Sequence, residues 1–487
     1  MTDPASGPDA GLPADSAAGE HTGGVVRIAS VAALGGLLFG YDSAVINGAV
    51  GAIESRFDIH GYASGFAVAS ALLGAAAGAL YAGRAADRLG RLFVMKAAAV
   101  AFLVSAIGAA FAPSLWLLIV FRLVGGIGVG MASVIAPAYI AEVSPAHIRG
   151  RLGSLQQLAI VLGIFGSQLV NYLLQQVAGG ASETLLGLAA WRWMFLVMAV
   201  PAVVYGALSL TIPESPRYLI SIGEVGQARA VLRRLLGTRN LDTAIHRIEV
   251  SVKRERPPAW SDVVRSGGGI YPIVWVGLGL SVLQQFVGIN VIFYYSNSLW
   301  QAVGFSESDS FLISMITSVT NIVTTFIAIA LVDRFGRRPL LLVGSAGMAV
   351  SLGVLAAAFA TATFDSSGDP SLGSVAGPVA LVAANVFVVA FGMSWGPIVW
   401  VLLGELFPNR YRAAALALAA GIQWVANWAV TVSFPGLTDA SLQLPYWLYT
   451  AFAVLSFAFV LRFVRETKGV ELEDMDDREE SPSVRPA

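Results

Sequence analysis

The chain has no cysteine and only four histidines among its 487 residues. Without cysteine, disulfides, thiolate metal sites and thiol nucleophiles are excluded. His21, His60, His147 and His246 lie far apart in sequence, so we predict no metal cluster. With neither a nucleophile–base pair nor a metal cluster indicated, the residues do not predict an enzyme.

Charge is also scarce: charged residues make up 13% of the chain, against about 25% in an average soluble protein. Hydrophobic residues make up 56%, and the mean hydropathy is +0.71. Segments 1–26, 214–265 and 465–487 hold 32 of the 61 charged residues, which leaves two long apolar blocks between them. This pattern predicts a polytopic membrane protein. The net charge of −1 gives no reason to expect a nucleic-acid partner.

The apolar blocks contain twelve runs, each long enough to cross a hydrocarbon layer of ~30 Å as a helix. Because the runs are continuous rather than alternating, they do not fit the strands of a transmembrane barrel. The predicted spans are 27–51, 64–84, 93–113, 115–140, 152–177, 191–212, 271–302, 308–332, 339–363, 376–403, 412–435 and 444–464.

Lys and Arg concentrate in alternate loops. The loops of one set hold 21 of these residues, whereas the other set holds only Arg56 and Arg192. By the positive-inside rule, we expect a multi-pass protein of the cell membrane with both termini in the cytoplasm. The predicted organisation is a disordered cytoplasmic tail (1–26), a six-helix half (27–213), cytoplasmic linker helices (214–270), a second six-helix half (271–464) and a cytoplasmic tail (465–487).

Two signatures occur once in each half, in the same order. Residues 87–91 (DRLGR) lie between spans two and three, and residues 333–337 (DRFGR) lie between spans eight and nine. Glu142, Pro145 and Arg149 share their spacing with Glu405, Pro408 and Arg412. The recurrence indicates a duplicated six-helix unit. It predicts an all-α membrane protein of two six-helix halves, typical of transporters, with a substrate site between the halves near mid-membrane.

Several motifs together link the sequence to a known family. They are Gly83-Arg84 with 87–91, 333–338, Pro213 to Arg217, Gln284 to Asn290, and Gly396-Pro397 followed by Trp400. On these motifs, residues 28 to about 469 resemble the sugar porters of the major facilitator superfamily. Proton-coupled bacterial glucose and xylose permeases are the members it resembles most. One departure is Arg465, where the family usually has Pro.

Asp42 in the first span and Arg122 in the fourth are isolated charges inside apolar segments. Such a charge costs at least about 2.5–3.5 kcal/mol at the bilayer centre, so it should face a water-filled cavity and have a function. A structural ion pair is the alternative, but a buried pair contributes little stability. The resemblance implies coupling, because proton-coupled sugar porters have Asp here and many passive facilitators have Asn. We predict that Asp42 binds the coupled proton and that Arg122 adjusts its proton affinity.

Uncharged amides are frequent in the spans of the second half. Amides donate and accept hydrogen bonds, as sugar hydroxyls do, although they also join membrane helices to each other. About 1.7 helical turns between Gln284 and Asn290 would let one helix reach both ends of a sugar ring. The resemblance places Gln157, Gln284, Gln285, Asn290 and Asn321 at sugar-holding positions, and Gln423 and Asn427 add amides in span eleven. Gln168 and Asn171 have no such match and are interpreted as packing residues.

Trp400 and Trp424 are candidate platforms for the apolar face of a pyranose. Anchoring at the membrane interface is the alternative. Gly396-Pro397 predicts a helix break that turns Trp400 toward the cavity. The resemblance adds Phe39 to the sugar site, and we expect Tyr294 to close its outer side. Ile164 stands where the bacterial xylose porter has a second Gln, which favours a hexose over xylose.

Acidic residues accompany the arginines of the Arg-rich loops. Positive charge alone would determine topology, so the acids indicate salt bridges. We predict a latch between the halves that holds the outward-facing state and releases when the cytoplasmic side opens. Its candidate residues are Arg84, Asp87, Arg88, Arg91, Glu142, Arg149, Arg151, Glu214, Arg217, Asp333, Arg334, Arg337, Arg338, Glu405 and Arg412.

These observations predict a proton–hexose symporter, with D-glucose as the expected substrate, that works by alternating access. We expect H⁺ as the coupled ion, no cofactor, no metal and a monomeric protein in the lipid bilayer. A passive facilitator is the nearest alternative, and Asp42 argues against it. Symport of xylose, galactose, arabinose or a polyol stays open, whereas a transporter-like sugar sensor would need a longer signalling tail than residues 465–487.

Overall fold

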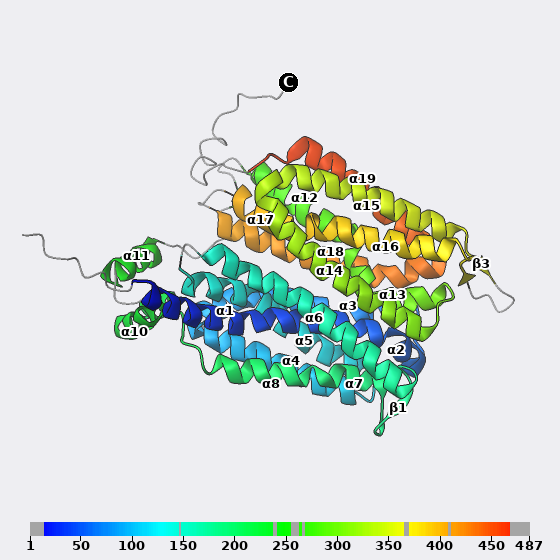
Figure 1. Cartoon of the computed structure of the whole chain (residues 1–487), viewed down its shortest axis with the longest axis horizontal. Helices are drawn as coiled ribbons and strands as arrows, with labels where there is room; N and C mark the ends of the chain where they lie inside the picture. Colours follow the sequence, from blue (N-terminus) through cyan, green and yellow to red (C-terminus); the bar gives the residue numbers. More distant parts are fainter. Residues whose placement is uncertain are drawn as a thin grey trace, which may run out of the picture.

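The computed structural model describes residues 14–145, 148–236, 241–254, 263–264, 268–364, 370–407 and 411–467. The helices form two bundles that lie side by side, and three short helices extend from one end (Figure 1). Among these described residues, twelve helical segments are long and apolar enough to cross a membrane. The predicted all-α fold of twelve spans in two halves is therefore confirmed, and the chain is a multi-pass membrane protein.

The first bundle contains the six spans of the N-terminal half. Its elements are α1 (Ala14–Val45), η1 (Ile46–Gly48), α2 (Val50–Phe57), α3 (Tyr62–Leu89), α4 (Arg91–Phe111), α5 (Leu115–Val143), α6 (Arg149–Ala178), the antiparallel hairpin β1 (Thr184–Leu185) and β2 (Leu188–Ala189), α7 (Ala190–Val197) and α8 (Ala199–Ser209). Three further helices follow, α9 (Pro216–Ser221), α10 (Val225–Leu236) and α11 (Leu241–Arg254). A small apolar cluster joins these three, including Leu219, Leu232 and Ile245.

The second bundle contains the other six spans. Its elements are α12 (Pro272–Phe286), α13 (Ile289–Ala302), α14 (Glu307–Phe335), α15 (Arg337–Ala360), the hairpin β3 (Thr363–Phe364) and β4 (Pro370–Ser371), α16 (Ala376–Gly392), α17 (Trp395–Leu406), α18 (Arg412–Ala440) and α19 (Leu444–Phe463). Two of its spans are interrupted, between α12 and α13 and between α16 and α17.

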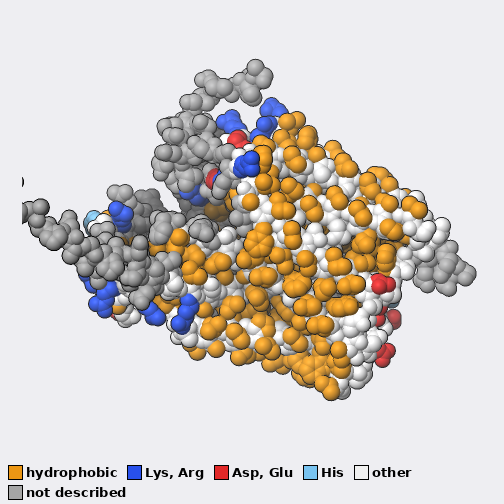
Figure 2. Space-filling view, viewed as in Figure 1, with side chains coloured by type: hydrophobic (Ala, Val, Ile, Leu, Met, Phe, Trp, Pro, Cys, Tyr) orange, Lys and Arg blue, Asp and Glu red, His pale blue; other side chains and the backbone are white. Residues whose placement is uncertain are grey.

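The two ends of the molecule carry opposite charge. Figure 2 shows apolar side chains over the flanks of the bundles, Lys and Arg near α10 and α11, and acidic side chains at the far end. We call the end with α9–α11 and the loops around Arg91 and Arg337 the basic end. The end with η1, α2 and the two hairpins, which carries Glu54 and Glu183, is the acidic end.

One prediction about the termini is wrong in part. The tail predicted to be disordered over 1–26 is helical from Ala14 onward, because α1 begins there. Residues 14–20 include three alanines and a glutamate, which favour helix, so the first span continues past its membrane segment. Residues 1–13 and 468–487 lie outside the described residues.

Glycines let α3 and α5 approach to backbone contact. A Cβ on Gly126 would lie 1.9 Å from the carbonyl oxygen of Ala71, and one on Gly130 would lie 2.1 Å from that of Ala75. Gly74 and Gly78 on α3 are equally close to the backbone of α5. Two facing pairs of glycines at a four-residue spacing are the small-residue interface typical of membrane helices. This interface fixes α5, and therefore Arg122, against the first bundle.

We expect Gly126→Val to destabilise the protein by about 3 kcal/mol or more, because the obstructing atom belongs to the backbone and cannot rotate away. Thermal unfolding of the detergent-solubilised protein measures the effect. Gly51→Val is the matched control, since a Cβ on Gly51 would meet nothing within 4 Å. Equal unfolding temperatures for the two variants would contradict the close approach of α3 and α5.

Candidate functional site

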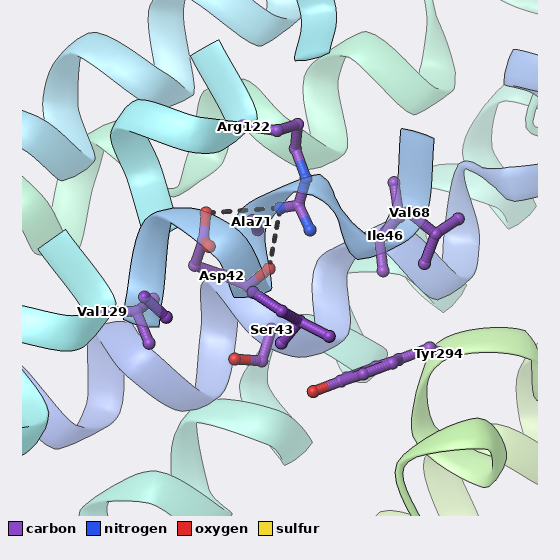
Figure 3. A pocket seen from close by; sticks show the side chains of 10 residues that line it. Asp42, Ser43, Ile46, Val68, Ala71, Arg122, Val129 and Tyr294 are labelled. Carbon is purple, nitrogen blue, oxygen red and sulfur yellow. Dashed lines mark hydrogen bonds and ion pairs between the residues drawn. The ribbon is translucent and has the colours of Figure 1, made fainter. Parts of the chain in front are cut away.

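Asp42 and Arg122 meet in the interior of the first bundle (Figure 3). Nη1 of Arg122, on α5, donates a hydrogen bond of 3.0 Å to the main-chain oxygen of Asp42, on α1, and lies 3.5 Å from its Oδ1. Their side chains are 2% and 1% exposed. Gly125 makes room for the carboxylate, because a Cβ there would lie 3.0 Å from Oδ1 of Asp42. The structure thus brings together the two charges that the sequence analysis singled out.

The pair keeps unused hydrogen-bonding capacity. Oδ2 of Asp42 and Nε of Arg122 have no hydrogen-bond partner among the described residues. Both side chains line a cavity of about 10 Å³, together with Ser43 of α1, Ile46 of η1 and Tyr294 of the second bundle. That volume is near the least that a water molecule needs. A carboxylate oxygen with a free lone pair at such a cavity is placed to take up a proton.

Tyr294 connects this cavity to the second bundle. It lies on α13 and is 6% exposed. Its hydroxyl interacts electrostatically with the side chains of Ser43, beside Asp42, and of Asn427 on α18. A predicted sugar-site residue therefore lies against the predicted proton site. A movement of α13 would therefore change the contacts directly beside Asp42.

The amides of the seventh span form a hydrogen-bonded chain. Nδ2 of Asn290 donates to Oε1 of Gln285 at 2.6 Å, and Nε2 of Gln285 donates to Oε1 of Gln284 at 3.4 Å. Nε2 of Gln284 donates to the main-chain oxygens of Trp395 and Gly396, at 2.7 and 3.1 Å. Gln284 therefore ties α12 to the start of α17.

The expectation that one continuous helix carries Gln284 and Asn290 is wrong. The span breaks at Gly288, whose φ of 82° is a left-handed conformation that suits glycine. A Cβ on Gly288 would also lie 2.4 Å from the ring of Tyr449. The break in the tenth span is present as predicted, but it lies at Met393 and Ser394. Pro397 falls in the first turn of α17, where it needs no amide hydrogen.

The predicted aromatic residues lie in different surroundings. Phe39 on α1 and Trp424 on α18 join the two bundles, with ring centroids 5.8 Å apart. Trp400 is 45% exposed. Ile164 on α6 lies beside Gly40, where a Cβ would come within 2.9 Å of the Ile164 nitrogen.

The remaining predicted amides are partly or fully buried. Asn427 is 6% exposed and accepts a hydrogen bond of 3.2 Å from Thr431. Oε1 of Gln423 is buried without a partner among the described residues, so it is available to a ligand donor. Gln157 and Asn321 are half-buried. Gln156, which the sequence analysis did not select, is 8% exposed, and neither of its amide atoms has a partner in the described part.

At the basic end, the first bundle carries a compact ionic cluster. Arg91 pairs with Asp87 at 3.3 Å and with Glu142 at 3.0 Å. The carboxylate of Glu214 accepts hydrogen bonds of 3.1 and 3.2 Å from the main-chain nitrogens of Arg91 and Leu92, at the start of α4. A carboxylate at a helix N-terminus satisfies its free N–H groups and complements the helix dipole. Ser215 completes the cluster by donating to Glu142.

The second bundle repeats this cluster. Arg337 pairs with Glu405 at 2.7 Å, and Glu466 accepts hydrogen bonds of 3.0 Å from the main-chain nitrogens of Arg337 and Arg338. Thr467 donates to Glu405 at 2.5 Å. Glu466 and Thr467 thus hold the places of Glu214 and Ser215. The sequence analysis missed them, although an acidic residue followed by a hydroxyl residue comes after the sixth span of each half.

In this conformation each of these pairs joins residues of one bundle, so the latch expected between the halves in the outward-facing state stays a prediction. In each cluster one glutamate binds the arginine and another binds the adjoining helix start, and all of these groups lie in the same half. Arg412 likewise donates to the nearby oxygen of Phe407 at 2.9 Å. Arg84 and Arg88 are exposed, and Arg334 lies over the ring of Phe335. Arg217 lies on α9, while the side chains of Arg149, Arg151 and Asp333 lie outside the described part.

Comparison with known proteins decides the family. The family model described as "Sugar (and other) transporter" matches residues 28–478. The chain belongs to this family of transporters. It is 54% identical over 454 residues to the glucose transport protein of Synechocystis, covering 93% of this chain and 97% of that protein. It is 38% identical to the D-xylose-proton symporter of Escherichia coli, covering 93% and 95% of the two chains.

Solved structures of a bacterial xylose transporter are similar to this chain. The inward-open xylose transporter XylE of E. coli has a TM-score of 0.80 at 36% identity, over 93% of this chain and 99% of that chain. XylE bound to 6-bromo-6-deoxy-D-glucose has a TM-score of 0.75 at 37% identity, over 94% and 100%.

Asn47 joins the two halves of the transporter at the acidic end. It is 1% exposed, and its Nδ2 donates to Ser296 on α13 at 2.9 Å and to Gln168 on α6 at 3.2 Å. Its Oδ1 accepts a hydrogen bond of 3.0 Å from the main-chain nitrogen of Asn297. Gln168, interpreted above as a packing residue, thus supports a contact between the halves. The transporter is closed at its acidic end.

Proposed function

We propose that the protein is a proton-coupled symporter that imports a hexose, most directly D-glucose, by alternating access. The observation that carries the proposal is the buried pair of Asp42 and Arg122 beside a cavity that Tyr294 of the other half also lines. A passive carrier needs no titratable group inside the bilayer, and an intramembrane carboxylate is costly without a function. In this proposal Asp42 binds the proton and Arg122 adjusts its proton affinity.

Both the side chains of the site and the similar proteins support a sugar as the substrate. Amides and aromatic rings suit a sugar, because hydroxyls need both donors and acceptors and the C–H face of the ring packs on an aromatic surface. Gln284 and Gln285 are already hydrogen-bonded, so a sugar would bind a preorganised chain of amides. The most similar relative above is named for glucose and is 54% identical. The 38% identical relative is named for xylose and protons.

We propose further sugar contacts at the other residues that the sequence resemblance selects. Phe39 and Trp424 form an aromatic contact between the halves, and Gln423 offers a free acceptor. Gln157, Asn321, Asn427, Trp400 and Tyr294 complete the proposed site. Ile164 would present an apolar side chain to the sugar where the bacterial xylose porter has a polar one. This difference favours a hexose over xylose.

The proposed orientation places the basic end in the cytoplasm of a cell membrane, by the positive-inside rule. The acidic end then faces outward, and the contacts of Asn47 make this an inward-facing conformation. Each ionic cluster joins helices of one half and would keep that half rigid during alternation. We propose that the clusters also form the faces of the cytoplasmic gate.

Sugar-induced alkalinisation tests the coupling. Adding glucose to a lightly buffered suspension of cells that contain the protein should raise the external pH, because symport removes protons with the sugar. A passive facilitator or a sugar sensor would move no protons, so an unchanged external pH with sugar uptake would overturn the coupling. Repeating the assay with xylose, galactose, arabinose and a polyol identifies the substrate.

A further inference from the structure

Glu54 lies where the two halves meet at the acidic end. It is on α2 of the first half, is half-buried, and accepts a hydrogen bond of 2.6 Å from Ser64 at the start of α3. The next residue, Gly65, packs directly on the second half: a Cβ there would lie 2.2 Å from the main-chain oxygen of Val432 on α18. Glu54 also interacts electrostatically with Tyr295 on α13. Its surroundings therefore include two helices of the opposite half.

The loop between α2 and α3 brings a second carboxylate to the same seam. Gly61 has a φ of 57°, and a Cβ there would lie 2.8 Å from Oδ2 of Asp439, at the end of α18. Gly436, one turn earlier, packs against the ring of Tyr62 in the same way. A carboxylate of each half therefore lies at this seam, Glu54 beside Ser64 and Asp439 beside Gly61. His60 lies in the loop between Glu54 and Gly61, and its charge interacts with the Glu54 carboxylate.

We propose that Glu54 is a second proton-binding group of this transporter, which takes up its proton as the acidic ends of the two halves close. The inference rests on the proposed alternation between open and closed ends, but it does not depend on Asp42. It gives the external pH an influence on closure that is separate from the coupling site.

The sign of the effect follows from the groups around Glu54. Burial raises the pKa of the Glu54 carboxyl and the Asp439 carboxylate raises it further, whereas the hydrogen bond from Ser64 and the charge of His60 lower it. Opening the acidic end would separate Asp439 and admit water, which returns the pKa toward its ordinary value of about 4.3. The closed state then binds the proton more tightly. Acidification therefore favours closure. Each unit of difference between the Glu54 pKa in the closed state and in the open state can change the ratio of closed to open molecules tenfold.

Because the chain lacks cysteine, two introduced cysteines measure closure without background. Ser182→Cys and Ser374→Cys place spin labels on exposed serines at the acidic end of the two halves. Electron–electron distance measurements on the full-length protein in nanodiscs then give the closed population. An Asp42→Asn parent removes the coupling carboxylate. In this parent we expect the closed population to rise as the pH falls from about 8 to about 5.

Three variants of this parent test the assignment. Glu54→Gln should abolish the pH response, and Asp439→Asn should move its midpoint to lower pH. Asp58→Asn is the matched control, an exposed acid of the same loop whose left-handed φ of 53° suits Asn, and it should leave the response unchanged. Retained sugar exchange shows that each variant is folded.

A pH response that persists in Glu54→Gln would overturn the proposal. His60→Gln separates the remaining alternative: loss of the response in that variant, but not in Glu54→Gln, would make the histidine the proton-sensitive group. Sugar accumulation by the Asp42→Asn parent would instead contradict the proposed function. The proposed role of Glu54 and the proposed symport would therefore be contradicted by different measurements.

Discussion

Asp42→Asn is expected to abolish sugar accumulation against a gradient while exchange of sugar at equilibrium continues. Asparagine keeps the shape of the side chain and an oxygen that accepts a hydrogen bond from Arg122. Its amide, however, does not bind a proton near neutral pH. The carrier would then alternate without a proton, so sugar would move only down its own gradient. In the wild-type protein Oδ2 of Asp42 is buried at a small cavity and has no hydrogen-bond partner among the described residues.

Counterflow and accumulation in proteoliposomes separate the two activities. A potential of about 100 mV supplies ~2.3 kcal/mol per charge, which allows roughly fifty-fold accumulation. We expect an accumulation ratio near one for Asp42→Asn, with exchange of labelled sugar still measurable. Asp58→Asn, at an exposed acid outside the ionic clusters, should keep accumulation and serves as the control. Uphill accumulation by Asp42→Asn would show that another group carries the proton.

The large-scale architecture was predictable because it depends on features that repeat along the chain. Continuous apolar runs determine the spans, and alternating Arg-rich loops distinguish the two ends. The signatures around Arg91 and Arg337 revealed the duplication, and the structure shows the same cluster around each arginine. Isolated charges were equally informative, since Asp42 and Arg122 had few other partners within the apolar spans.

Contacts between helices were less predictable, because spacing along one helix does not say what lies opposite it. Glu142 and Glu405 looked like partners for a latch, but each finds its arginine within its own half. The break at Gly288 turned two amides on one expected helix into neighbours on two helices. Asn47 showed no motif, and its role appears only from the side chains that surround it in the closed end.

Asn47→Ala is expected to shift the transporter away from the state that is closed at the acidic end. The substitution removes side-chain hydrogen bonds to Ser296 and to the main chain of Asn297, both in the second half, and one to Gln168. Such bonds between membrane helices average about 0.6 kcal/mol and reach about 1.7 kcal/mol. The total of about 1–3 kcal/mol corresponds to a roughly five- to hundredfold fall in the ratio of closed to open molecules.

The distance between labels at Ser182→Cys and Ser374→Cys reports this ratio, because the two positions lie on different halves. Asn171→Ala is the matched control. Nδ2 of Asn171 donates to the main-chain oxygen of Val45 at 3.2 Å, within the first half, so its loss should weaken the open and closed states alike. If Asn171→Ala shifted the distances as far as Asn47→Ala, the effect would come from a loosened first bundle. A shift confined to Asn47→Ala would instead mean that this one amide, at the end of the first span, holds the outer gate shut while the basic end is free to open.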